Sequence, residues 1–64
     1  MADPILVDWF AAKHAAAIHD MTPDVFAHAV ARDAALPPSP LADAVRAADE
    51  AELRRRVLVA GGVR

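Results

Sequence analysis

The chain lacks most of the residues that give a small protein a chemical site or a covalent support. Its 64 residues include no cysteine, and the only aliphatic side-chain hydroxyls are those of Thr22 and Ser39. Without cysteine there is no disulfide, no thiolate metal ligand and no thiol nucleophile. A chain this short buries only about 60 % of the surface that its unfolded form exposes. We therefore expect one domain of marginal stability, supported by close helix packing or by association with another chain.

Long apolar runs and a large net charge are also missing. No apolar run approaches the roughly 20 residues of a membrane span. The amino terminus carries Asp3 where a signal peptide would be basic, and Asp8 interrupts its apolar run. A net charge of -2 and a pI near 5.8 argue against a general affinity for nucleic-acid phosphates. The sequence predicts a cytoplasmic protein without membrane contact, and it disfavours nucleic acid as a partner.

Three dipeptides punctuate the chain in the same way, namely Asp3-Pro4, Thr22-Pro23 and Ser39-Pro40. In each, a side chain that accepts hydrogen bonds precedes a proline, and this combination is typical of the first turn of a helix. A run of helix-forming residues follows every one of them. The fold class predicted is therefore all-α, a small three-helix unit with neighbouring helices roughly antiparallel. The expected helices cover about residues 4–20, 23–35 and 40–60.

The third helix has an alternative form with a break near Asp49. The segment from Asp49 to Glu52 resembles an N-cap followed three residues later by an acidic residue, which could open a fourth helix. Against this, Arg46 and Glu50 are opposite charges four residues apart across the proposed break, a spacing that supports a continuous helix. We favour one helix, ended by Gly61-Gly62.

The first helix contains the only tryptophan and is apolar almost all round. Ile5 and Trp9 lie in one apolar row and Leu6 and Phe10 in a second, while Val7 and Ile18 fall on the far side. A helix without a clean polar face is usually buried by several neighbours. This pattern predicts that the first helix is the one around which the others pack, and that Trp9 is largely buried.

The third helix carries two apolar stripes. Leu41, Val45 and Ala48 share one face, whereas Leu53 and Val57 lie roughly 130° round from it. Only one stripe of a continuous helix can face the small core, and an exposed stripe often marks an interface. We therefore predict a partner-binding surface on the carboxyl half of this helix. Its residues are Leu53, Val57 and Leu58, with Arg54, Arg55 and Arg56 at the rim.

No catalytic, cofactor-binding or metal site is expected. His14 and His19 are five residues apart, about 140° around a helix, whereas helical zinc ligands are spaced by three or four. With His28, they are interpreted as solvated or locally paired histidines. Thr22 and Ser39 are explained as N-caps, which leaves no hydroxyl nucleophile for a hydrolase. The sequence therefore indicates a protein that is not an enzyme.

Two functional hypotheses follow. The first is a protein-interaction module, such as an adaptor, an inhibitor or an accessory subunit, which binds another protein or a second copy of itself through a helical surface. The alternative is a small nucleic-acid-binding regulator that uses the run from Arg54 to Arg56. The structural alternative for this run is that its cations pair with Glu50 and Glu52, because Glu50 and Arg54, and likewise Glu52 and Arg56, are opposite charges four residues apart. The acidic balance of the chain favours the interaction module.

Overall fold

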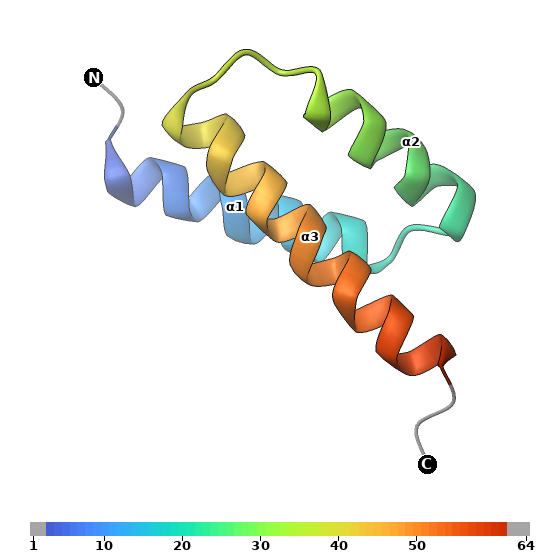
Figure 1. Ribbon diagram of the computed structural model, residues 1–64. Coiled ribbons are helices and arrows are strands. Elements are labelled where there is room, and N and C mark those ends of the chain that lie inside the picture. The colour runs from blue at the N-terminus through green and yellow to red at the C-terminus, as the bar shows by residue number, and fades with distance from the viewer. Residues whose placement is uncertain (1–2, 62–64) are drawn as a thin grey trace.

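The computed structural model describes residues 3–61, which form three helices (Figure 1). The predicted all-α three-helix unit is confirmed, and each helix begins at the proline that the sequence indicated. Their predicted ends differ from the observed ends by no more than one residue. The third helix runs without interruption through Asp49, which excludes the alternative with a break. The helices are α1 (Pro4–His19), α2 (Pro23–Ala34) and α3 (Pro40–Ala60).

Side-chain caps fix the beginning of all three helices. The Asp3 carboxylate accepts a hydrogen bond from the Ile5 amide at 2.9 Å. Thr22 Oγ1 accepts one from the Val25 amide at 3.4 Å, and Ser39 Oγ accepts one from the Ala42 amide at 3.0 Å. These bonds satisfy amides that have no partner within the helix. At the other end of α3, Gly61 is the C-cap as predicted, and Gly62 lies outside the described residues.

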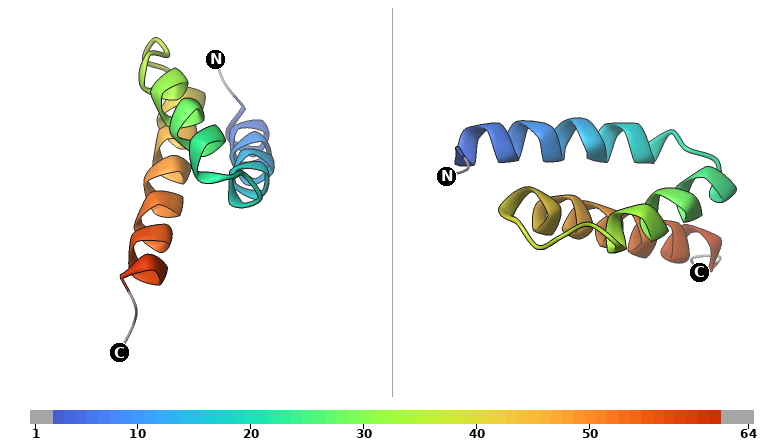
Figure 2. Two further views of the ribbon diagram at one scale, coloured as in Figure 1. Left: turned by 90° about the vertical axis from the view of Figure 1, so that its right-hand side faces the viewer. Right: turned by 90° about the horizontal axis from the view of Figure 1, so that it is seen from above.

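The helix in the middle of the fold is α3, which corrects the prediction that α1 is the central one. The largest interface joins α1 to α3, and α2 packs on α3 as well, whereas α1 and α2 barely touch each other. The chain reverses direction at each loop, and the carboxyl end of α3 extends away from the other two helices (Figures 1 and 2). The result is an elongated unit of 45 × 21 × 16 Å.

The face of α1 that meets the rest of the molecule contains Val7, Ala11, His14 and Ile18. Their spacing of four, three and four residues places them along one seam of the helix, as in a coiled coil. Trp9 lies off this seam and is 52 % exposed, so the prediction that it is buried was wrong. The physical reason is that α1 is covered by a single helix, α3, and not by several neighbours. The seam through which α1 contacts α3 contains His14 and not Trp9.

The corresponding seam of α3 changes from apolar residues near its amino-terminal end to charged residues toward its carboxyl-terminal end. It begins with Ala42 and Val45 and continues through Asp49, Glu52 and Arg56, again at spacings of three and four residues. Asp49 and Glu52 are buried, although carboxylates are seldom buried without partners. The interface between the helices is therefore apolar in one half and ionic in the other.

Little apolar surface is fully buried within residues 3–61. The buried hydrophobic residues are Ile18, Phe26, Ala29 and Ala42, and two of these are alanines, which contribute little burial each. Meanwhile large apolar side chains on α1 and α3 are exposed. None of the described helices combines the length and the hydropathy needed to cross a membrane.

We predict that Ile18 stabilises this fold far more than Trp9 does. Ile18 is completely buried, so Ile18→Ala should cost about 2–5 kcal/mol and Ile18→Val about 0.5–1.5 kcal/mol. Trp9→Ala should cost about 1 kcal/mol or less, since half of its surface is already in water. Urea denaturation followed by far-ultraviolet circular dichroism measures all three variants. A loss for Trp9→Ala as large as that for Ile18→Ala would contradict the described packing.

Candidate functional site

The carboxyl half of α3 exposes a row of large apolar side chains, which we call the α3 patch. Its members are Leu53, Val57 and Leu58, with 49 %, 61 % and 62 % of their surface exposed. Val59 beside them is also exposed. The patch lies on the carboxyl half of α3, whose end extends away from α1 and α2 (Figure 1). The sequence predicted an exposed apolar stripe here, and the observed exposure agrees with that expectation.

A groove between α2 and α3 adjoins the α3 patch. It encloses about 610 Å³ and is open to solvent along one side. Leu53 and Val57 belong both to the patch and to the wall of the groove, while Phe26 and Val30 form the opposite wall. The remaining lining residues are Pro23, Ala27, Arg56 and Ala60. The patch and the groove thus form one continuous, mainly apolar surface.

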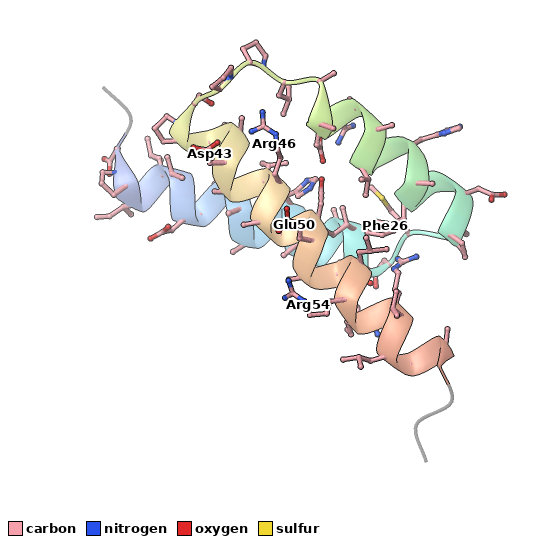
Figure 3. All side chains as sticks on the ribbon, in the orientation of Figure 1. Phe26, Asp43, Arg46, Glu50 and Arg54 are labelled. Atoms are coloured by element: carbon pink, nitrogen blue, oxygen red, sulfur yellow. The ribbon has the colours of Figure 1, made fainter. Side chains whose placement is uncertain are left out.

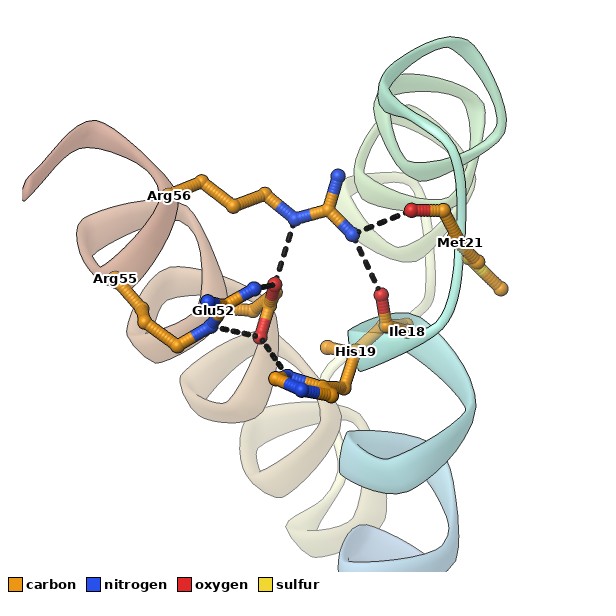
Figure 4. Close-up of polar contacts among 6 residues, drawn as sticks. All are labelled: Ile18, His19, Met21, Glu52, Arg55 and Arg56. Carbon is orange, nitrogen blue, oxygen red and sulfur yellow. Dashed lines mark hydrogen bonds and ion pairs between the residues drawn. The ribbon is translucent and has the colours of Figure 1, made fainter. Parts of the chain in front are cut away.

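The three arginines that the sequence placed together have different environments. Arg55 donates two hydrogen bonds to the Glu52 carboxylate, at 3.1 and 2.6 Å, and Arg56 donates one at 2.6 Å (Figure 4). Arg54 has no hydrogen bond or ion pair with any described residue, and it is exposed near Glu50 on α3 (Figure 3). Of the predicted rim, only Arg54 is left fully available to a partner.

Arg56 is the cation that is most integrated into the fold. Its Nη2 donates to the carbonyl oxygens of Ile18, at 2.8 Å, and Met21, at 2.7 Å (Figure 4). Ile18 belongs to the last turn of α1, where carbonyl groups lack partners within the helix. The guanidinium carbon also lies 4.3 Å from the centre of the Phe26 ring. Arg56 therefore links α3 to α1, to α2 and to the loop between them.

The arginines hold Glu52 in its ionised form. Hydrogen bonds from Arg55 and Arg56 lower the pKa of Glu52 to about 2. The same contact raises the pKa of Arg55. His19 Nδ1 lies 3.4 Å from Glu52 Oε1 and completes the group. A carboxylate held in this way cannot serve as a general acid near neutral pH.

Two of the ion pairs expected along α3 are absent among the described residues. Arg46 does not pair with Glu50. It bonds instead to Asp43, at 3.3 Å, and to the Leu36 carbonyl, at 2.7 Å, because its side chain points to the loop before α3 (Figure 3). Glu50 and Arg54 also have no bond to each other. The pair of Glu52 and Arg56 is confirmed.

A second polar cluster lies on the amino-terminal side of Glu52, and the sequence analysis missed it. His14 Nε2 is 2.6 Å from Asp49 Oδ1 and 3.3 Å from Asp33 Oδ2. His14 is therefore neither solvated nor paired with a neighbour in sequence, because its partners lie on α2 and α3. The spacing of four, three and four residues along the seam of α1 (residues 7–18) could have marked His14 as a seam position, but it does not identify the partners of His14.

The two buried carboxyl groups of this cluster differ in acidity. Burial and the neighbouring Asp33 carboxyl raise the pKa of Asp49. Burial also penalises the charge of Asp33, yet its interactions with Asp49 and with the Arg32 guanidinium outweigh that penalty and lower its pKa. Arg32 Nε donates to Asp33 Oδ1 at 3.1 Å. Asp33 is therefore the more acidic carboxyl group of the two.

Comparison of the sequence with protein-family models and with curated proteins, and of the structure with solved structures, found no match. We therefore infer function from the contacts, burial and charges of residues 3–61.

We predict that the contribution of Glu52 to stability disappears in acid. Its folded pKa of about 2 is below the ordinary value of 4.5, so its ionised form stabilises the fold above pH 4.5 and this effect is lost as the pH falls toward 2. The melting temperature of the parent should therefore exceed that of Glu52→Gln at pH 5 to 7, and the difference should shrink by pH 2.

Glu50→Gln is the matched control, because Glu50 is an exposed carboxylate on the same helix without a described partner. Its melting temperature should follow that of the parent at every pH. A difference between parent and Glu52→Gln that stays constant from pH 7 to pH 2 would show that the carboxylate charge is not what stabilises the fold.

Proposed function

We propose that the protein is a non-enzymatic protein-interaction module that binds a second copy of itself through the α3 patch. Such a module serves as an adaptor, an inhibitor or an accessory subunit in the cytoplasm. The observation that carries the proposal is the exposure of Leu53, Val57 and Leu58 beside an open apolar groove. Contiguous exposed apolar surface on a small protein usually marks a place where another molecule binds.

The shortage of buried apolar surface supports association. The large apolar side chains that could have filled the core lie outside it, while the interface between α1 and α3 contains Asp49, Glu52 and Arg56. A domain of this length has little burial of its own, and a shared interface adds what is missing. Covering the α3 patch removes apolar area from water at about 25 cal/mol per Å² before the costs of association.

Charge complementarity favours a second copy as the occupant. Glu50 and Arg54 both adjoin Leu53 and Val57 in a shallow hollow on α3, and neither has an ion pair with a described residue. In a two-fold dimer the same patch meets itself. An antiparallel arrangement of two α3 segments brings Glu50 of one copy toward Arg54 of the other, and opposite charges at a rim help to set orientation.

The other functional classes have less support. Thr22 and Ser39, the aliphatic hydroxyls of the chain, both accept hydrogen bonds as helix caps. Neither forms a hydrogen bond to a basic side chain among the described residues, as an activated nucleophile would. The nucleic-acid alternative depended on three adjacent cations. Since Glu52 neutralises much of the charge of Arg55 and Arg56, only Arg54 remains for phosphate contacts.

The test is the double variant Leu53→Glu with Val57→Glu, measured by light scattering or sedimentation at several protein concentrations. The parent should increase in mass toward a dimer as its concentration rises. The double variant should remain a monomer, because two added carboxylates would be buried without partners in the interface. It should keep its helical circular dichroism, since both side chains are exposed in the single chain.

Ala47→Glu with Ala51→Glu is the matched control. These alanines are exposed on the same helix, are also four residues apart, and add the same charge outside the α3 patch. This variant should dimerise as the parent does. If the parent stays monomeric at all concentrations, the second copy is not the occupant. If Leu53→Glu with Val57→Glu dimerises as well, the patch is not the interface.

A further inference from the structure

We infer that His14, Asp33 and Asp49 form a binding site for a divalent metal ion of the zinc class, at a point where α1, α2 and α3 meet. Each helix supplies one ligand: an imidazole nitrogen from α1, and one carboxylate oxygen each from α2 and α3. The site is separate from the α3 patch, and the inference does not depend on the proposed dimer. It departs from the sequence-based expectation of no metal site, which considered only ligands spaced along a single helix.

The distances fit an ion of this size. One ligand atom from each residue lies within 4.8 Å of the others. In a tetrahedral zinc site with bonds of about 2.0 Å, neighbouring ligand atoms are about 3.3 Å apart. His14 Nε2 and Asp33 Oδ2 are 3.3 Å apart, and His14 Nε2 and Asp49 Oδ1 are 2.6 Å apart. The second distance has to widen by less than about 1 Å for an ion to enter. The two carboxylate oxygens lie within 4.8 Å of each other.

Two buried oxygen atoms in the cluster lack a hydrogen-bond donor. Asp33 and Asp49 are only 2 % and 4 % exposed, and the Oδ2 atom of each has no hydrogen-bond partner among the described protein atoms. Buried carboxylate oxygens without donors are rare in folded proteins, because such atoms lose their hydration without compensation. Asp33 Oδ2 faces His14 Nε2 at 3.3 Å, so it is directed into the cluster. A divalent cation bound there would compensate both carboxylates.

The surroundings match those of a metal site. Arg32 Nε donates to Asp33 Oδ1, which orients the carboxylate and leaves Oδ2 free to bind an ion, as outer-shell hydrogen bonds do in metalloproteins. A hollow of about 410 Å³, bounded by His14, Asp33, Pro38 and Leu41, leads to the cluster from solvent. It offers a path of entry and room for a water molecule as fourth ligand.

The ligand chemistry selects the class of ion. One imidazole nitrogen with two carboxylate oxygens suits zinc and the neighbouring first-row divalent ions. Calcium takes six to eight oxygen ligands, and magnesium requires nearly octahedral oxygen coordination, so a small site with a nitrogen ligand disfavours both. The competing explanation is that His14 itself bridges the two carboxylates through its 2.6 and 3.3 Å contacts, without a metal.

The experiment is titration of zinc chloride into the full, chelator-treated chain by calorimetry, together with thermal melting at rising zinc concentrations. We expect saturable binding of one ion per chain and a melting temperature that rises with zinc concentration, because a ligand bound only by the folded state stabilises it. Magnesium chloride at the same concentrations should show no saturable binding and should leave the melting temperature unchanged. Absence of saturable binding, or one ion per two chains, would overturn the inference.

Variants identify the ligands. Asp49→Asn and Asp33→Asn preserve side-chain shape and should weaken zinc binding at least tenfold, as should His14→Ala. His28→Ala is the control, since His28 is an exposed histidine on α2 outside the cluster. It should bind zinc as the parent does. Equal binding by Asp49→Asn and the parent would assign the zinc to other groups. If the cluster variants do not fold, the test is the effect of zinc on the melting temperature of the parent. A parent whose melting temperature does not rise with zinc would reject the site.

Discussion

The guanidinium of Arg56 makes the contacts on which the arrangement of the three helices depends. It bonds to Glu52 on its own helix, to the Ile18 and Met21 carbonyls where α1 ends, and it stacks on Phe26 of α2. Because α1 and α2 share few contacts, they are held together mainly at α3, by this group and by the contacts of His14 with Asp33 and Asp49. Planar guanidinium groups suit such a junction, because their five donors point in fixed directions.

An interface built on charges has consequences for the rest of the surface. Asp49, Glu52 and Arg56 occupy seam positions that apolar residues fill in most helix pairs. Ionic groups in an interior need every partner in place, and removing one partner costs more than the pair contributes. The large apolar residues of α1 and α3, including Trp9 and Leu53, consequently lie outside the seam. Because charged residues occupy the seam, the large apolar side chains remain on the surface, where they are available for association.

The sequence predicted what depends on neighbours along the chain. Helix starts followed from caps such as Ser39 beside a proline, and the contact of Glu52 with Arg56 followed from their spacing. What it could not predict depends on distant residues. Trp9 was expected inside because apolar residues surround it in sequence, but the seam of α1 was determined by the fit to α3. The partners of His14 come from two other helices, and no local pattern identifies them.

The most direct test of this account compares Arg56→Gln with Arg54→Gln by urea denaturation. Both variants remove one positive charge from the same helix, but only Arg56 bonds to Glu52 and to the end of α1. Loss of hydrogen bonds to a charged group should reduce the free energy of unfolding by about 1.5–3 kcal/mol for Arg56→Gln. The change for Arg54→Gln should stay within about 0.5 kcal/mol. Equal effects of the two substitutions would contradict the role assigned to Arg56.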